Sequence, residues 1–179
     1  MRIDLLNAVK RQVIILTSYS DLSKEEQNEI FKEIIKDHYQ YPRNHVLCDK
    51  PEYYHVHLKN PSCGDDLTVQ VSIVDNKITD IRQKGDGCSI CCASASMMSE
   101  ICCGDDIATA EKKIDEFKKM VRGEQYDMEI LSEAISLQGV VKVPPRIKCS
   151  TLAWLALEKA LMQEEKVLSL STEDGEEFK

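Results

Sequence analysis

The chain has 179 residues, of which 42% are hydrophobic and 30% are charged, and its formal net charge is -8. The length suits one domain with a proper core, and the composition is ordinary for a globular protein. Phosphate repels an acidic chain, so the charge argues against a nucleic-acid partner and against binding to anionic membrane, and it favours a basic partner.

No apolar run approaches the roughly 20 residues of a membrane-spanning helix. Near the N-terminus the uninterrupted apolar run is Val13 to Leu16, which is shorter than the core of a signal peptide. We therefore expect a cytoplasmic protein. In that reducing compartment, eight cysteines indicate metal or redox chemistry rather than stable disulfides, although free cysteine also packs as a small hydrophobe.

The first 22 residues read as an N-terminal extension, in which apolar spacing over 2–16 weakly predicts a helix. Ser23, followed three residues later by Glu26, is typical of a helix start. This helix is expected to end before Pro42, because proline disfavours helical geometry in the residue that precedes it.

Alternating apolar residues then predict three strands, at 54–58, 67–74 and 77–83. Tight connections join these three short strands, which favours an antiparallel meander. After the strands the apolar spacing becomes helical. Four helices are expected: one from Cys88 to a stop at Gly104, one capped by Asp105 or Asp106 and ended by Gly123, one over 127–137, and one from Ser150 to Gln163.

The expected order is thus helix, three strands, then helices. This order predicts an α+β fold, with a small three-stranded antiparallel sheet and helices packed on one face. Residues 23–166 would form this domain, and 167–179 a polar C-terminal tail. Pro144 and Pro145 are expected to force an extended approach to the last helix.

The loop from Asn60 to Asp65 places a thiol and a carboxylate two residues apart, at Cys63 and Asp65. Gly64 between them lets both side chains turn toward one point. The same residues are common in plain turns, so this loop alone does not establish a metal site.

Two further cysteines have settings that suit a metal site. Cys88 and Cys149 each stand at the start of a predicted helix, where the helix dipole favours a thiolate. Three sulfurs and one carboxylate suit tetrahedral zinc, and the positive charges of Arg146 and Lys148 could offset the negative charge of such a site. We predict that the ligands are Cys63, Asp65, Cys88 and Cys149.

Other candidate ligands receive weaker support. Cys88 and Cys91 have the C-x-x-C spacing of zinc and redox motifs. Even so, Cys91, Cys92, Cys102 and Cys103 fall in one predicted helix and are expected to be core or partly exposed thiols. Cys48 receives no role. Three histidines, His38, His55 and His57, are expected on helix or strand surfaces. His45 lies in a predicted loop and remains open as a ligand.

These motifs resemble the U-type iron–sulfur assembly proteins, and within them the SufU branch. The resemblance covers roughly residues 24–165. The matching segments are Asp37-His38-Tyr39 with Pro42-Arg43-Asn44, Asn60 to Asp65, Gly85 to Ile90 with Ala93 to Met98, and Arg146 to Cys149 with Thr151 to Trp154. Scaffold-type (IscU) members carry a histidine where this chain has Lys148, and they have a shorter connection between the second and third cysteines.

The resemblance implies zinc bound by Cys63, Asp65, Cys88 and Cys149, with Cys63 as sulfur acceptor. It also implies two kinds of partner: a pyridoxal-phosphate cysteine desulfurase of the SufS type, and downstream iron–sulfur assembly proteins. Two alternatives stay open. An iron–sulfur scaffold would assemble a cluster on the same cysteines and hold iron instead of zinc. A structural zinc domain would be closed and inert, and would serve only as an interaction module.

Overall fold

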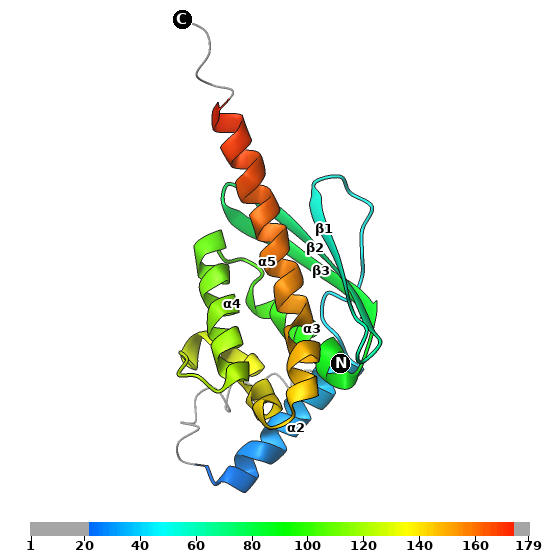
Figure 1. Cartoon of the computed structure of the whole chain (residues 1–179), viewed down its shortest axis with the longest axis vertical. Coiled ribbons are helices and arrows are strands. Elements are labelled where there is room, and N and C mark those ends of the chain that lie inside the picture. Colours follow the sequence, from blue (N-terminus) through cyan, green and yellow to red (C-terminus); the bar gives the residue numbers. More distant parts are fainter. Residues whose placement is uncertain (1–21, 174–179) are drawn as a thin grey trace, which may run out of the picture.

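The computed structural model describes residues 22–173, and the side chains of residues 22–164. Its order of elements, helix then sheet then helices, confirms the predicted α+β class (Figure 1). The elements are α2 (Lys24–Gln40), β1 (Tyr53–Asn60), β2 (Asp65–Val74), β3 (Lys77–Asp86), α3 (Ser89–Ile101), α4 (Ile107–Arg122), η2 (Glu129–Lys142) and α5 (Pro144–Glu173). The predicted helix over 2–16 lies outside the described residues.

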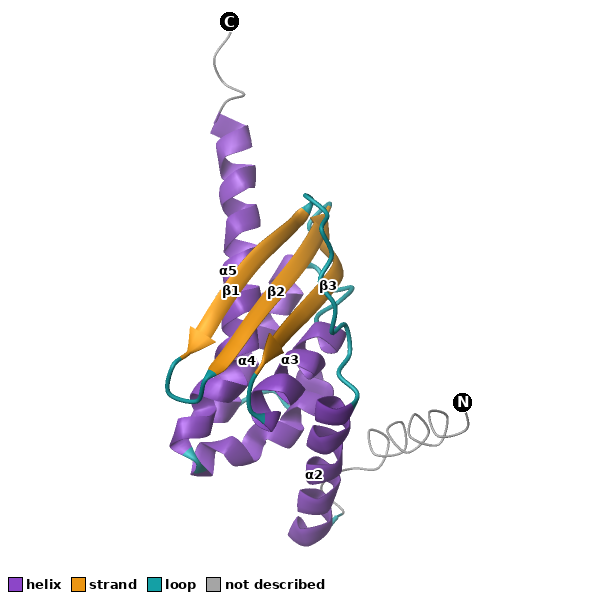
Figure 2. Ribbon diagram, turned by 90° about the vertical axis from the view of Figure 1, so that its right-hand side faces the viewer, coloured by secondary structure: helices purple, strands orange, loops and turns teal. Residues whose placement is uncertain are grey.

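The three strands form an antiparallel sheet in the order β1-β2-β3, as the meander predicts. Helices cover one face of it (Figure 2). Leu67, Val69 and Val71 of β2 are buried at alternate positions, which follows from the two-residue period of a strand. The sheet therefore supplies one wall of the core.

The predicted helix caps are present. The Ser23 hydroxyl accepts from the Glu26 backbone N–H at 3.3 Å, and the Glu26 carboxylate accepts from the Ser23 N–H at 2.9 Å. Asp106 caps α4 through the Thr109 N–H, and Gly123 ends it with a φ of 76°. Each cap satisfies backbone groups that a helix terminus leaves without intrahelical partners.

The last helix corrects the prediction. It begins at Pro144 and not at Ser150, and it runs past residue 166 to Glu173. Proline fits the first turn of a helix because its missing N–H would have no intrahelical partner there. The Arg146 N–H donates to the Val143 carbonyl at 2.8 Å and closes that turn. Cys149 therefore lies in the second turn of α5, and the proposed effect of a helix N-terminus does not apply to it.

Two further helical predictions need correction. The segment predicted as a helix over 127–137 is the 3-10 helix η2, which is interrupted at Ser132, where φ is 47°. Helix α3 ends before the second pair of adjacent cysteines: Cys102 is its C-cap and Cys103 follows in the turn. As expected, Cys102 is buried and Cys103 is half-buried.

A buried contact at Trp154 fixes α5 against its neighbours. The indole stacks on Phe117 of α4, with ring centroids 4.1 Å apart, and its N–H donates to the Ser94 hydroxyl of α3 at 3.0 Å. Ser94 in turn donates to the Ser150 carbonyl at 2.6 Å. These contacts hold the start of α3 and the second turn of α5 in a fixed relation, which matters because Cys88 and Cys149 lie there.

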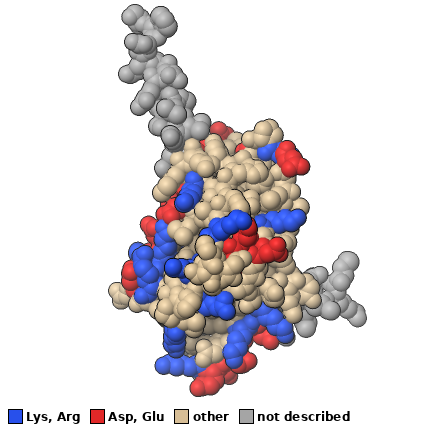
Figure 3. Space-filling view, turned by 45° about the vertical axis from the view of Figure 1, so that its right-hand side comes forward, with Lys and Arg blue, Asp and Glu red and all other residues tan. Residues whose placement is uncertain are grey.

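Among the helices of residues 22–173, none combines the length and the hydropathy that a bilayer-spanning segment requires. On the face shown in Figure 3, Lys and Arg side chains are interspersed with Asp and Glu side chains. A partner that docks on this face would therefore meet both signs of charge, despite the net charge of -8.

Candidate metal centre

The hairpin between β1 and β2 carries the first two predicted ligands. Asn60 pairs with Asp65 across the sheet, and the Asn60 carbonyl accepts from the N–H groups of Cys63 and Gly64 at 3.2 and 3.0 Å. Gly64 has a φ of 72°, a conformation that glycine adopts without strain. The turn leaves Cys63 half-buried and directs Asp65 into the domain, where it is 1% exposed.

The end of β3 brings Cys88 to the same place. Asp86 pairs with Asp66, so the chain leaving β3 passes beside Asp65. The Cys88 N–H donates to Asp65 Oδ1 at 2.9 Å, and Cys88 is the N-cap of α3. A β-carbon added at Gly87 would lie only 2.8 Å from Asp65 Oδ1, so the carboxylate occupies space that the glycine leaves free.

Three predicted ligands converge. The ligand atoms of Cys63, Asp65 and Cys149 all lie within 4.8 Å of one another. Zinc binds cysteine sulfur at about 2.3 Å and carboxylate oxygen at about 2.1 Å, so the ligand atoms of a tetrahedral site stand roughly 3.5 Å apart. Small side-chain rotations would close this group around an ion. Cys88 is outside this set of mutually close atoms, but its backbone N–H donates to Asp65 Oδ1, and its thiol is near enough to Cys149 to help raise the pKa of that thiol.

Asn60, a residue type common in turns, joins the same group. Its side-chain amide is buried and donates to Asp65 Oδ2 at 3.1 Å and to Cys149 Sγ at 3.5 Å. Its side-chain oxygen accepts from the Ser62 N–H at 3.3 Å. Asn60 therefore orients both the carboxylate and the thiol, as residues that surround metal ligands commonly do.

The electrostatics of the group suit metal binding. Burial acts to raise the pKa of Asp65, but hydrogen bonds from the Cys149 thiol, the Cys88 N–H and Asn60 outweigh it and hold that pKa below its usual value. Burial, followed by the hydrogen bond to Asp65, raises the pKa of Cys149. The metal-free site thus pairs an ionised carboxylate with a neutral thiol, and a metal ion would replace the thiol proton.

The two predicted supporting charges differ. Arg146 lies one helical turn before Cys149, and its hydrogen bond with that thiol raises the pKa of the guanidinium. Lys148 is exposed on α5, and its backbone carbonyl accepts from the Thr151 hydroxyl at 3.4 Å. Of the two, Arg146 is the cation whose pKa responds to the thiol group.

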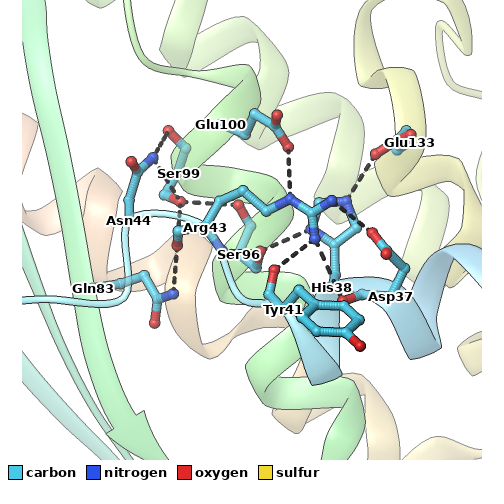
Figure 4. A network of polar contacts seen from close by, with 10 residues as sticks. All are labelled: Asp37, His38, Tyr41, Arg43, Asn44, Gln83, Ser96, Ser99, Glu100 and Glu133. Atoms are coloured by element: carbon cyan, nitrogen blue, oxygen red, sulfur yellow. Dashed lines mark hydrogen bonds and ion pairs between the residues drawn. The ribbon is translucent and has the colours of Figure 1, made fainter. Parts of the chain in front are cut away.

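A second polar group corrects the expectation that His38 is a surface residue. His38 is fully buried, and its ring nitrogens lie 2.8 Å from Ser96 Oγ and 2.8 Å from Glu133 Oε2 (Figure 4). One oxygen of Glu100 lies close enough to complete a three-residue group. Arg43 already places a cation 3.8 Å from Glu100. The network joins α2 to α3 and η2, and we interpret it as structural.

The other histidines also lie away from the thiols. His45 Nδ1 is 3.3 Å from Gln83 Oε1, and His55 Nε2 is 2.7 Å from Gln70 Nε2. His57 contacts Asp66. Among the described residues, the group of Cys63, Asp65 and Cys149 therefore includes no histidine.

Fold and site together define a thiol-rich α+β domain with a potential metal centre at one end of its sheet. The family described as NifU-like N terminal domain matches residues 30–167. The chain is 43% identical over 138 residues to the zinc-dependent sulfurtransferase SufU of Bacillus subtilis (strain 168), across 76% of this chain and 92% of that relative. It is 38% identical over 153 residues to the iron-sulfur cluster assembly scaffold protein IscU of Streptococcus pyogenes serotype M1, across 85% and 95%.

Solved structures of similar proteins have the same fold. FiSufU from Fervidobacterium islandicum AW-1 superposes with a TM-score of 0.67 at 31% identity, across 72% of this chain and 94% of that chain. The N-terminal part of a NifU-like protein from Brucella abortus shares the fold, with a TM-score of 0.69 at 17% identity, across 75% and 93%. This chain belongs to the NifU-N/IscU family of iron–sulfur cluster assembly proteins.

Proposed function

We propose that this protein is a zinc-dependent sulfurtransferase of the SufU type, which accepts persulfide sulfur on Cys63 from a pyridoxal-phosphate cysteine desulfurase. One observation carries the proposal: a half-buried thiol on a turn is held beside a carboxylate and a second thiol, with the three ligand atoms within 4.8 Å of one another. The name of the Bacillus subtilis relative supports the same function.

Zinc would be held by Cys63, Asp65, Cys88 and Cys149. These donors fit the ion because thiolates and a carboxylate are its ordinary ligands. Bound zinc would keep the thiols deprotonated. Arg146 partly offsets the negative charge of four anionic ligands. The side-chain amide of Asn60 orients Asp65 and Cys149 by donating hydrogen bonds to both.

The transfer step follows the chemistry of thiol–disulfide exchange. The Cys63 thiolate attacks the outer sulfur of the desulfurase persulfide. The sulfur–sulfur bond of that persulfide breaks, and the desulfurase cysteine leaves as a thiolate, so Cys63 becomes the persulfide. A metal-bound thiolate is a blunted nucleophile. Cys63 would therefore have to leave the metal when the partner docks, and a ligand supplied by the partner would take its position.

All eight cysteines are free thiols, which supports a cytoplasmic location and a role that uses reduced sulfur. The sulfur carried on Cys63 would then pass to downstream iron–sulfur assembly proteins.

An iron–sulfur scaffold is the second candidate. The similarity to IscU of Streptococcus pyogenes favours it, and the same cysteines would hold the cluster. Two features favour sulfur transfer instead: Lys148 directly precedes Cys149, and the three-residue group around that thiol includes no described histidine. A structural zinc module, the third reading, would have no use for a half-buried thiol on an exposed turn.

Two measurements test the proposal. Protein purified without oxygen should contain about one zinc per chain and be colourless, whereas iron, sulfide and visible absorbance would identify a scaffold. Turnover of a cysteine desulfurase should rise when the zinc-loaded protein is added. Labelled sulfur from the desulfurase should appear on Cys63, and its absence from a colourless, zinc-loaded protein would leave only the structural module.

Gly87→Ala should weaken zinc binding roughly 10- to 100-fold, the range typical of changes beside metal ligands. The added β-carbon would lie 2.8 Å from Asp65 Oδ1 and 3.3 Å from Asp65 Cβ, so the buried carboxylate would have to move. Competition against a chromophoric chelator measures the change. Gly139→Ala is the matched control, because a β-carbon there meets no atom within 4 Å. Equal zinc affinities of the two variants would show that the position of the carboxylate is unimportant.

A further inference from the structure

A groove between α2 and η2 has no part in the proposed function. Its volume is about 590 Å³, and the apolar side chains that line it include Phe31 and Ile35 of α2 and Val141 of η2. A second cavity of about 180 Å³ shares Ile35 with the groove and is also lined by Ile90 and Val143. Val141 is 37% exposed and Val143 is 48% exposed. The groove and the cavity together leave a strip of apolar surface that the described side chains, those of residues 22–164, do not cover.

The two walls of the groove are held in a fixed relation. His38 Nε2 lies 2.8 Å from Glu133 Oε2, and this contact ties α2 to η2. The space between the walls is open, because a β-carbon added at Gly139, which lines the groove, would meet no atom within 4 Å. An exposed apolar groove between fixed walls is typical of a docking site.

The N-terminal extension joins the domain at this groove. Lys24, the first residue of α2, lines the groove, and Ser23 caps the helix immediately before it. Residues 17–22 separate that cap from the helix that the sequence predicts over 2–16. Connections of about 2–8 residues are ordinary between packed helices, and short connections place two helices antiparallel beside each other. The tether also gives the segment a high effective concentration at the groove.

The sequence of the segment suits an apolar groove. In a helix over 2–16, one face would carry the apolar residues Leu5, Leu6, Val9, Val13 and Leu16. Such a helix would be about 22 Å long, and the part of α2 that lines the groove, residues 24–35, measures about 17 Å. The segment is therefore long enough to fill the groove. A helix of this length is only marginally stable alone, so burial of its apolar face is what would stabilise it.

We propose that residues 2–16 form a helix that docks in this groove, antiparallel to α2, with its apolar face against Ile35 and Val141. Its C-terminal end then lies beside Lys24, and its first residues reach the second cavity, which Arg146 also lines. The segment thus covers the apolar strip up to the edge of the metal centre and supplies no ligand. This inference concerns packing alone, so it does not depend on sulfur transfer.

Charge distinguishes this occupant from an acidic partner. The described charged residues that line the groove are all basic: Lys24, Lys32 and Lys142. The segment over 2–16 has three basic residues and one acid, which are Arg2, Lys10, Arg11 and Asp4. Exposed charges interact weakly in water, so burial of the apolar face outweighs their repulsion. Because salt screens that repulsion, added salt should strengthen docking of the segment slightly, whereas it would weaken docking of an acidic partner.

Hydrogen exchange of the full-length protein, measured by mass spectrometry, tests the proposal. Backbone amides over 5–16 should exchange at least about tenfold more slowly than in an unstructured chain. Val141→Ser in the groove and Val13→Ser in the segment should each speed this exchange roughly tenfold, the typical effect of losing one buried valine side chain. Val74→Ser is the control for the groove, because Val74 is exposed at the end of β2. Ile15→Ser is the control for the segment, because Ile15 would lie on the other side of the helix.

Slow exchange of the β2 amides in every variant shows that the domain is folded. Rapid exchange over 5–16 in the wild type would overturn the proposal, and so would protection that Val141→Ser leaves unchanged. Protection that disappears when the protein is diluted would overturn it in favour of the same segment from a second copy. Protection that added salt weakens would contradict apolar docking. The assay uses neither zinc nor a desulfurase, so its failure and the failure of the proposed function are distinguishable.

Discussion

Cys63→Ala should reduce the stimulation of a cysteine desulfurase to nothing and leave the domain folded. The thiol is the proposed acceptor, so its loss removes the chemical step and not only an affinity. The side chain is half-buried on a turn, and the turn itself is held by backbone hydrogen bonds to the Asn60 carbonyl. We therefore expect the free energy of unfolding of the metal-free protein to change by less than about 1 kcal/mol. Desulfurase turnover and a denaturant titration measure the two effects.

Cys103→Ala is the control for this prediction. Cys103 is also half-buried and has only a weak thiol contact, but it lies on the turn after α3, beside Thr79. The Cys103→Ala variant should stimulate the desulfurase as much as the wild type does. Full stimulation by Cys63→Ala would contradict the proposed acceptor, whatever metal the variant holds.

The parts of the fold that local chemistry determines could be predicted from the sequence. The cap formed by Ser23 and Glu26 needs only residues within one turn, and Gly123 ends its helix through its own backbone freedom. Alternation along β2 likewise places Leu67, Val69 and Val71 in the core, although Gln70 and Ser72 between and beyond them are buried as well. These predictions held because distant residues do not change the local preference.

The start of the last helix, next to two prolines, was harder to predict from the sequence. Pro144 and Pro145 suit an extended segment as well as they suit the first turn of a helix. The local sequence therefore does not decide between these two conformations. The choice follows from packing, because α5 lies against β1, β2 and α3. Cys149 consequently reaches the site from within the helix. Its selection as a ligand rested partly on a helix start at Ser150, and that physical reason was wrong because α5 begins at Pro144.

Residues whose role depends on a distant partner could not be predicted. From the sequence, Asn60 is a turn residue. The structure places Cys149, 89 residues later in the chain, within hydrogen-bond distance of its side-chain amide. From the sequence, His38 is a surface residue of an amphipathic helix. The structure shows that it is hydrogen-bonded to Ser96 and Glu133, which come from other elements. In both cases the signal is a buried polar group whose hydrogen bonds come from other elements, which only the tertiary structure shows.

Zinc affinity should fall at least tenfold for each unit that the pH is lowered, over roughly pH 8 to 6. Burial raises the pKa of Cys149, so in this range the metal-free protein carries a proton on that thiol, and zinc must displace it. Lower pH favours the protonated, metal-free form, which fixes the sign. The pKa of Asp65 is lowered, so this carboxylate is already ionised and adds nothing to the slope. Chelator competition at several pH values, corrected for protonation of the chelator, measures the slope.

Two variants separate the contribution of the thiol from that of the carboxylate. Asp65→Asn should weaken zinc binding at every pH and leave the slope unchanged, because it removes a ligand that releases no proton. Cys149→Ala should also weaken binding, but it should lower the slope by about one proton per zinc. If Cys149→Ala kept the full slope, the displaced proton would come from another group, and Cys149 would not be the protonated thiol of the metal-free site.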